Sequence, residues 1–420
     1  MILKLFFYIL DLFYKRTRLG ESVPKDCPLL LVANHPNGLV DQILIAKISG
    51  RPIKMLAKEP IFRMPIIGWL TKKSGGIPVY RKQDGHDTGA NNRTFDAVYA
   101  ELAKGGAVLI FPEGISHNLP NLQKLKTGAA RMALGAEALA GIPMGTKIVP
   151  VGIVYRNKTS FRSSLAIEVG KAIEVEPFAE SWKQDEREAA NELTKKIEAG
   201  LKKVTLELEE WEDLPLLQLA EDLLQSGNKT NESKHRVQRL RELANIGQKK
   251  SKESPEQIKS LRLRLTEFKN RIERLGLSVR DLDARYSIKN VSLFLAINIS
   301  AITIGFPIAL IGALFWIIPW GISKFVIKLV AANEDVVATA KFFAGFLFFP
   351  PWVIAVHNIY PLSLINILGL FICGIYARHF WARRNKAFRE IKVFLLFLSR
   401  ARLRLLLKQE RDDLIYLLKG

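Results

Sequence analysis

The chain has 420 residues, which is enough for two or three domains. Its formal net charge is +21, but no helix-turn-helix, zinc-finger or RNA-binding motif accompanies that charge. A basic surface that faces anionic lipid headgroups is therefore a better explanation than nucleic acid binding. The two cysteines, Cys27 and Cys373, stand far apart in apolar surroundings, which suits a reducing compartment and indicates neither a disulfide framework nor a metal site.

Residues 1–20 begin with an apolar, aromatic run and end with basic residues, among them Lys15, Arg16 and Arg18. In a signal peptide the charge would come first and a small-residue cleavage site would follow. The apolar run is also shorter than the roughly 20 residues that a spanning helix needs. We therefore expect an interfacial helix that lies on the membrane surface.

The next segment places a histidine near a carboxylate. Residues 29–33 are an apolar run typical of a buried strand, turn-forming residues follow, and residues 39–48 have the pattern of a helix. His35 and Asp41 therefore lie where a strand leads into a helix. A neutral imidazole can take a proton from a substrate alcohol, while a carboxylate on its other nitrogen fixes the tautomer. Taken alone, such a histidine is more often a surface or hydrogen-bonded residue.

Short apolar runs continue to alternate with helical patterns as far as about residue 180, which predicts an α/β sandwich domain over residues 21–180. The expected strands are residues 54–57, 76–80, 108–111, 148–155 and 165–169. Phe111-Pro112-Glu113-Gly114 closes the third of these strands, and Ile115-Ser116-His117 comes next. Residues 122–140 then have a helix-like pattern that carries Lys124 and Lys126.

Four of these segments together resemble the glycerolipid acyltransferases, the family of lysophosphatidic acid and glycerol-3-phosphate acyltransferases. The matching blocks are the His35–Asp41 pair, Gly75-Gly76-Ile77-Pro78-Val79-Tyr80-Arg81, Phe111-Pro112-Glu113-Gly114 and Ile148-Val149-Pro150-Val151-Gly152-Ile153. They occur in the family's order over residues 28–155. The resemblance implies the family's fold and an acyltransferase activity.

Two departures bear on the acceptor. Five residues rather than four separate His35 from Asp41, which resembles the branch that includes fungal-type glycerol-3-phosphate acyltransferases. Many members that use lysophosphatidic acid continue the Glu-Gly block with Thr-Arg-Ser, whereas this chain has Ile115-Ser116-His117. The resemblance therefore favours glycerol-3-phosphate over a lysophospholipid such as lysophosphatidic acid as the acceptor.

The resemblance implies that His35 is the general base and that Asp41 orients it, with direct transfer from acyl-CoA or acyl-ACP and no cofactor or metal. Backbone N–H groups near Gly114 or at the start of the helix after His35 would stabilise the oxyanion. The expected substrate-binding residues are Arg81 as the first candidate for the acceptor phosphate, with Glu113, Gly114, Ser116, Lys124 and Lys126. Some alternatives stay open. The two lysines can simply lie on a solvated helix face, Glu113 can fix the turn, and Ser116 can cap a helix. The whole domain can also be an inactive lipid-binding scaffold.

Beyond residue 180 the pattern changes to helices. Residues 181–288 predict a charged helical arm, and residues 289–377 predict a transmembrane region. That region holds two stretches without Lys, Arg, Asp or Glu, residues 291–323 and 342–377, which together allow two to four spans. Residues 378–420 are basic, so the positive-inside rule places this tail on the cytosolic face, and we expect the catalytic domain there too. The tail is also expected to lie on the membrane as an amphipathic helix through Leu403, Leu406, Leu407, Leu414 and Leu417.

Overall fold

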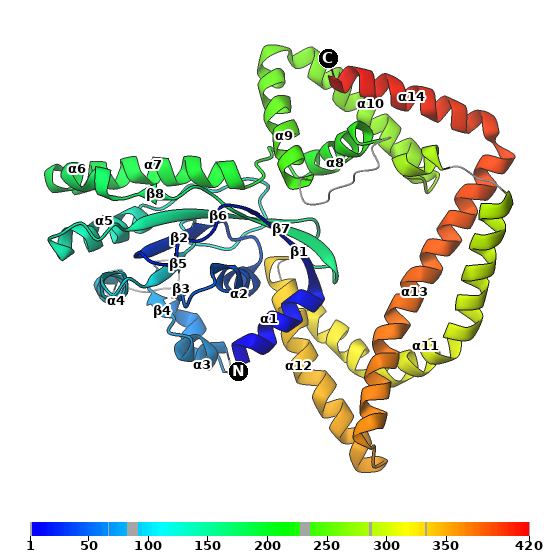
Figure 1. Cartoon of the computed structure of the whole chain (residues 1–420), viewed down its shortest axis with the longest axis horizontal. Helices are drawn as coiled ribbons and strands as arrows, with labels where there is room; N and C mark the ends of the chain where they lie inside the picture. Colours follow the sequence, from blue (N-terminus) through cyan, green and yellow to red (C-terminus); the bar gives the residue numbers. More distant parts are fainter. Residues whose placement is uncertain are drawn as a thin grey trace. The chain divides into compact units, whose positions relative to one another are not determined.

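The computed structural model describes residues 2–65, 67–81, 91–226, 236–284, 288–331 and 334–419 (Figure 1). Parts of the predicted arm, residues 227–235 and 285–287, therefore lie outside the described residues. The chain forms two compact units. The first comprises residues 1–211 with 333–339, and the second comprises residues 212–332 with 340–420.

An eight-stranded sheet organises the first unit. Its strands are β1 (Tyr14–Gly20), β2 (Leu29–Ala33), β3 (Lys54–Lys58), β4 (Ile77–Val79), β5 (Ala107–Ile110), β6 (Lys147–Tyr155), β7 (Ser163–Val169) and β8 (Ile173–Glu174). The order is β1-β7-β6-β2-β5-β3-β4, and β8 also pairs with β6. Strand β2 is central and runs parallel to both β5 and β6. The predicted α/β domain is thus confirmed, and the carboxyl ends of β2 and β5 meet at one edge.

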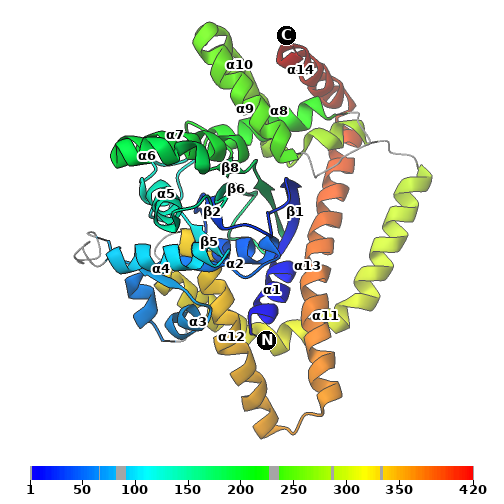
Figure 2. The same ribbon diagram turned by 60° about the vertical axis from the view of Figure 1, so that its left-hand side comes forward.

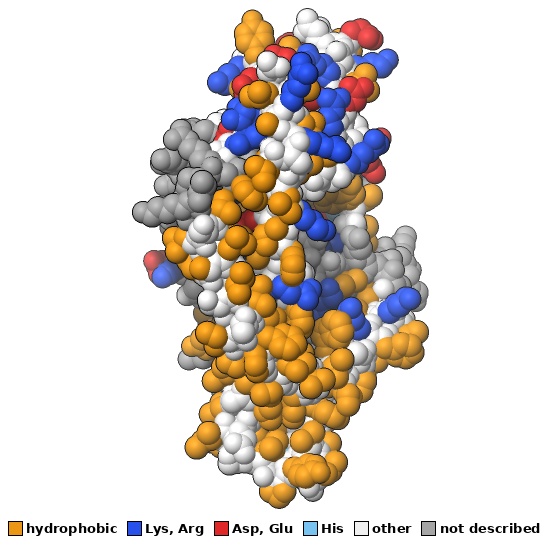
Figure 3. All heavy atoms as spheres, turned by 90° about the vertical axis from the view of Figure 1, so that its right-hand side faces the viewer, with side chains coloured by type: hydrophobic (Ala, Val, Ile, Leu, Met, Phe, Trp, Pro, Cys, Tyr) orange, Lys and Arg blue, Asp and Glu red, His pale blue; other side chains and the backbone are white. Residues whose placement is uncertain are grey.

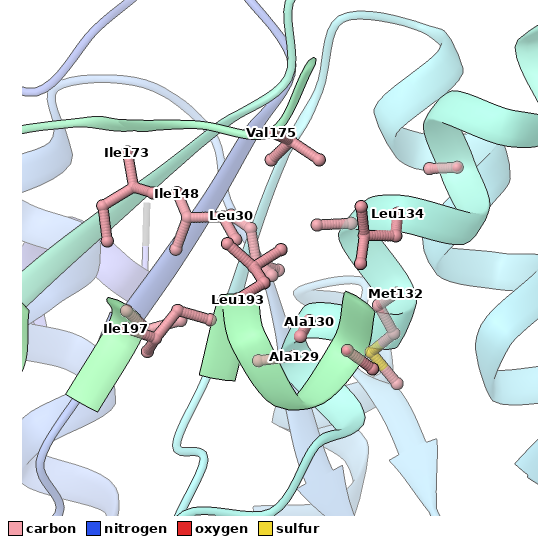
Figure 4. Close-up of a cluster of buried hydrophobic side chains, with 14 of the residues drawn as sticks. Leu30, Ala129, Ala130, Met132, Leu134, Ile148, Ile173, Val175, Leu193 and Ile197 are labelled. Carbon is pink, nitrogen blue, oxygen red and sulfur yellow. The ribbon is translucent and has the colours of Figure 1, made fainter. Parts of the chain in front are cut away.

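Helices cover the sheet on both faces (Figure 2). They are α2 (Gly38–Ser49), α3 (Ile67–Lys73), α4 (Asn91–Ala103), α5 (Gly128–Ala140), α6 (Ala179–Gln184) and α7 (Glu186–Val204), with 3-10 turns at Glu59–Arg63 and Glu176–Phe178. Leu30 of β2 and Ile148 of β6 pack against Ala130 of α5 and Leu193 of α7 in one hydrophobic core (Figure 4). Because strand side chains alternate between faces, Leu30 and Val32 point to this core together.

The N-terminal segment differs from its prediction. Helix α1 (Ile2–Phe13) ends early, and residues 14–20 form β1, parallel to β7. The interfacial helix expected over residues 1–20 is therefore wrong for residues 14–20. Tyr14 and Leu19 are buried, whereas the basic side chains between them belong to an edge strand, where charge guards against unwanted pairing.

The helix expected from residue 122 also begins later, at Gly128. The backbone N–H groups before Gly128 donate to distant parts of the chain and not to the carbonyl groups four residues earlier, as they would in a helix. Gln123 donates to the Glu113 carboxylate at 2.7 Å, and Lys126 donates to the Pro112 carbonyl at 2.9 Å. Residues 122–127 are thus an irregular segment fastened to the Glu-Gly turn.

The second unit is helical. It contains α8 (Asp213–Leu224), α9 (Arg236–Glu253), α10 (Pro255–Arg274), the 3-10 turn η6 (Val279–Asp283), α11 (Ile288–Val330), most of α12 (Glu334–Ile359), α13 (Leu364–Ser399) and α14 (Ala401–Lys419). Helix α13 continues through residue 378, so no break separates the apolar region from the tail.

The predicted arm and tail share one hydrophobic core. Leu407 and Leu414 of α14 are 1% and 0% exposed, and they pack with Leu223 of α8 and Phe268 of α10. The expectation that the tail leucines face the membrane is therefore wrong for Leu407 and Leu414. An amphipathic pattern shows that a helix has an apolar face, but the face of α14 is covered by the arm.

Three helices among the described residues are long and apolar enough to cross a membrane: Val291–Val330, Val336–Ile359 and Leu364–Ser399. At most 17% of the most apolar window of each is buried. The first predicted stretch is a single helix with Pro307 and Pro319 inside it, and the second is divided by a break at residues 360–363. Apolar side chains cover much of the surface of α11 and α13 (Figure 3).

Candidate active site

His35 and Asp41 meet at the carboxyl edge of the sheet. His35 follows the end of β2, and Asp41 lies in the first turn of α2. The His35 Nδ1 atom is 3.1 Å from Asp41 Oδ2. Asn37, at the N-cap position of α2, lies between them, and its N–H donates to the same carboxylate oxygen at 2.6 Å. The longer spacing therefore preserves the contact.

The imidazole is fixed on two sides. Its ring stacks on Phe111 with a centroid separation of 3.8 Å and an interplanar angle of 9°. Asp41 is 0% exposed, and as the partner of Nδ1 it selects the tautomer that carries a proton there. The His35 side chain is 13% exposed, and among the described residues Nε2 has no hydrogen-bond partner. Nε2 can therefore accept a proton from an incoming hydroxyl.

Two tyrosines that the sequence did not reveal support this pair. The Tyr155 hydroxyl, at the end of β6, donates to Asp41 Oδ1 at 2.6 Å. The Tyr14 hydroxyl accepts from the Asn37 side-chain amide at 3.1 Å and donates to the Lys158 carbonyl. Burial raises the pKa of Tyr155 and of Tyr14 well above the ordinary value, so both hydroxyls keep their protons. The only sequence signal was the position of Tyr155 at the end of the expected strand, residues 148–155.

Side chains also fix the backbone around His35. Asn34 extends the ladder between β2 and β6, because its side-chain amide donates to the Ile153 carbonyl at 3.0 Å and its side-chain oxygen accepts from the Ile153 N–H at 2.8 Å. The Lys158 ammonium donates to the Pro36 carbonyl at 3.0 Å. The turn that carries His35 is therefore held from both ends.

Glu113 joins the two sequence blocks. Its side chain is fully buried and accepts from the His35 N–H at 3.3 Å, from the Gln123 N–H at 2.7 Å and from His117 Nε2. The His117 N–H in turn donates to the His35 carbonyl at 3.2 Å. With these donors already on its carboxylate, Glu113 has the environment of a turn-fixing group, which is one of the two roles left open by the sequence.

The remaining predicted site residues separate into two groups. Arg81 donates to the Gly114 carbonyl at 2.7 Å, which brings the end of β4 to the Glu-Gly turn. Gly114 has a φ of +75°, and a Cβ there would lie 2.6 Å from the Lys126 ammonium nitrogen, so Lys126 also reaches this turn. By contrast, Lys124 is exposed in the irregular segment, and Ser116 is only partly buried.

Comparisons with known proteins find similar acyltransferases. Residues 16–154 match the family model described as Acyltransferase. Glycerol-3-phosphate O-acyltransferase 2 of Saccharomyces cerevisiae is 40% identical over 136 residues, which are 32% of this chain and 18% of that protein. The chloroplastic 1-acyl-sn-glycerol-3-phosphate acyltransferase LPAT1 of Arabidopsis thaliana is 34% identical over 146 residues, which are 33% of this chain and 39% of that protein.

A solved structure, the 1-acyl-sn-glycerophosphate (LPA) acyltransferase PlsC from Thermotoga maritima, is 21% identical and covers 46% of this chain and 73% of its own, with a TM-score of 0.34. The two relatives named in the preceding paragraph are matched over only 18% and 39% of their own length, so the chain spans less than half of each.

Proposed function

We propose that residues 16–154, which match the Acyltransferase family model, form a domain that transfers a fatty acyl group to a hydroxyl of a glycerol phosphate in phospholipid synthesis. The observation that carries the proposal is the His35–Asp41 pair, at 3.1 Å, in which the His35 side chain is 13% exposed. A histidine so arranged has the geometry of a general base for a substrate alcohol.

The acyl group passes directly from the thioester to the acceptor hydroxyl, and no acyl-enzyme forms. His35 Nε2 takes the proton of the acceptor hydroxyl as its oxygen bonds to the acyl carbonyl carbon. The carbon–sulfur bond then breaks, and the imidazolium returns the proton to the departing thiolate. Asp41 stabilises the imidazolium through Nδ1 and holds the ring in the correct orientation.

The oxyanion requires donors with free N–H groups. The Gly114 N–H already donates to the Phe111 carbonyl at 3.0 Å. The first N–H groups of α2 are the better candidates, because a helix N-terminus presents unsatisfied donors beside His35. One such donor contributes about 3 kcal/mol to transition-state stabilisation in other enzymes.

The acceptor phosphate is assigned to the surface formed by Arg81 and Lys126 at the Glu-Gly turn. A guanidinium group matches a phosphate with two parallel hydrogen bonds, which makes Arg81 the first candidate. The His35–Asp41 spacing and the similarity to a yeast glycerol-3-phosphate O-acyltransferase support glycerol-3-phosphate over lysophosphatidic acid. Acyl-CoA or acyl-ACP is the donor.

The protein acts at a bilayer, with its domain and its basic tail on the cytosolic face. The three apolar helices support membrane attachment. Nine Lys and Arg residues between 378 and 404 support the cytosolic position of the tail under the positive-inside rule.

An acceptor panel tests the proposal. The purified full chain in lipid nanodiscs is given labelled acyl-CoA or acyl-ACP with glycerol-3-phosphate, lysophosphatidic acid or other lysophospholipids. We expect transfer to glycerol-3-phosphate and a loss of about 100-fold or more in His35→Ala, within the range of general-base effects. His379→Ala, at an exposed position, is the matched control. Absence of transfer to every acceptor, together with retained lipid binding, would instead support an inactive scaffold.

A further inference from the structure

The apolar helices raise the question whether the chain crosses the bilayer an odd or an even number of times. Three helices among the described residues are long and apolar enough to cross a bilayer. If each crossed once, the segment before α11 and the segment after α13 would lie on opposite faces of the membrane. The second unit itself shows whether that is possible.

Those two segments are joined. Leu277 and Leu282, before α11, share a hydrophobic core with Val393 and Phe397 of α13 and with α14. Ion pairs connect the same parts: Arg389 with Asp281 at 2.8 Å, Arg411 with Asp283 at 2.6 Å and Arg271 with Glu410 at 2.8 Å. A folded core of this kind lies on one side of a bilayer, so the chain between Leu282 and Val393 crosses an even number of times.

Contacts between α11, α12 and α13 show which of their residues lie at the same depth in the membrane. The indole N–H of Trp316 in α11 donates to the Leu370 carbonyl of α13 at 2.9 Å, and that of Trp352 in α12 donates to the Phe315 carbonyl at 2.9 Å. These contacts place residues 315–316 of α11 at the level of Leu370 and Trp352.

The ends of the charge-free segments mark another level. Lys341 directly precedes the charge-free part of α12, Arg378 directly follows that of α13, and Lys324 directly follows that of α11. At 1.5 Å per helical residue, Leu370 is about 12 Å from the level of Arg378, and Trp352 is about 16 Å from the level of Lys341. Because the hydrocarbon core is about 30 Å thick, residues 315–316 of α11 lie near its middle.

Helix α11 must then reverse direction. Lys324 follows Trp316 by only eight residues, about 12 Å of helix, and between them the ribbon of α11 bends so that its last part runs back from the hairpin of α12 and α13 (Figures 1 and 2). Pro319 lies between them, and a proline inside a helix removes one hydrogen bond and introduces a kink. Near the start of α11, Asn298 contacts Arg383, at a level where long basic side chains reach the headgroups.

We propose that the second unit crosses the bilayer twice and not three times: α12 and α13 cross as a hairpin, and α11 enters to the middle and returns at Pro319. The charge-free part of α12, residues 342–359, is about 27 Å long, close to one hydrocarbon core. At the hairpin tip, Tyr360 is 71% exposed, as expected of an aromatic side chain at the far interface.

The membrane interface on the side of the helical arm, at the level of Lys324 and Arg378, has a composition that favours contact with lipid headgroups. Lys324 lies over the ring of Trp320 at 4.2 Å, and Arg384 lies over the ring of Trp381 at 4.4 Å. Tryptophan with a basic neighbour is typical of the boundary between hydrocarbon and anionic headgroups. In Figure 3 the apolar surface of α11 and α13 gives way to Lys and Arg side chains in the direction away from the hairpin tip.

Single cysteines test this arrangement in the full chain after both native thiols are removed by Cys27→Ala and Cys373→Ala. A membrane-impermeant maleimide is applied to sealed vesicles of either orientation and again after detergent. Gel filtration and a thermal melt in detergent establish that each variant is folded, so the result does not depend on the proposed activity.

We expect Lys249→Cys in the arm, Lys328→Cys after the kink and Lys419→Cys in the tail to be labelled from the same side, and Ser363→Cys at the tip to be labelled only from the other. Labelling of Lys328→Cys from the side opposite to Lys249→Cys would show that α11 crosses. Labelling of Ser363→Cys from the arm's side, or only after detergent, would show that the hairpin does not cross. Either result overturns the proposal.

Discussion

Replacing Tyr155 with phenylalanine removes one oxygen from the support of the proposed base and nothing else. The Tyr155 hydroxyl donates to Asp41 Oδ1 at 2.6 Å, while Oδ2 faces His35 Nδ1 and the Asn37 N–H. Asp41 is fully buried, so water does not readily replace the lost donor. The substitution therefore leaves one oxygen of a buried carboxylate unsatisfied.

The expected effect follows from the cost of that loss. A hydrogen bond to a charged group contributes about 1.5–3 kcal/mol, and about 1.4 kcal/mol corresponds to a factor of ten in rate. Without this donor, the carboxylate that orients His35 is held less firmly. We therefore expect kcat/KM to fall about tenfold.

The assay is the steady-state kinetics of acyl transfer, with kcat and the acceptor KM measured separately. The KM should stay near that of the wild type, because Tyr155 supports the base and not the acceptor. Tyr99→Phe is the matched control, since it removes a tyrosine hydroxyl from α4, away from the site. A Tyr155→Phe variant with the kcat and KM of the wild type, even with a lower melting temperature, would refute the reasoning.

Three further predictions concern the acceptor and the second unit. Arg81→Ala should raise the KM for glycerol-3-phosphate about tenfold or more with a smaller change in kcat, and Arg81→Lys should restore only part of it, as measured by steady-state kinetics. Leu407→Asp should lower the melting temperature of the full chain strongly because it buries a charge in the shared core, whereas Leu406→Asp, at an exposed position, should not. Gly312→Leu should separate α11 from α13, because a Cβ there would lie 2.1 Å from the Cys373 carbonyl oxygen, and thermal melts in detergent should show little effect for the unobstructed Gly321→Leu.

The sheet was largely predictable because its strands are buried on both faces. Runs such as residues 29–33 and 107–110 are continuously apolar, which is the pattern of central parallel strands. Strand β1 gave no such signal, since an edge strand with Lys15, Arg16 and Arg18 has the composition of a flank to an apolar helix. Its partner β7 lies about 150 residues away in the sequence, so no local pattern indicates the pairing.

The candidate site was predictable where the family blocks carry it. His35, Asp41, Glu113 and Gly114 are brought together because β2 and β5 are adjacent and parallel. Tyr155 could not be assigned a role from the sequence, because its contact with Asp41 depends on the register of β6 against β2. A residue's role in such a network depends on partners from distant strands, which composition and spacing do not encode.

The turn between His35 and Asp41 also supports the carboxylate. Asn37, at the N-cap position of α2, donates its N–H to Asp41 Oδ2, beside the Nδ1 contact. Together with Tyr155, this gives the buried carboxylate donors on both oxygens before any substrate binds. A carboxylate held in this way does not need to reorganise when the imidazole becomes charged, and fixed donors and charges of this kind are what lower the barrier in a water-poor site. The turn and Tyr155 thus supply a preorganised partner for the proposed base, and the kinetics of Tyr155→Phe measure how much of that preorganisation depends on a single hydroxyl.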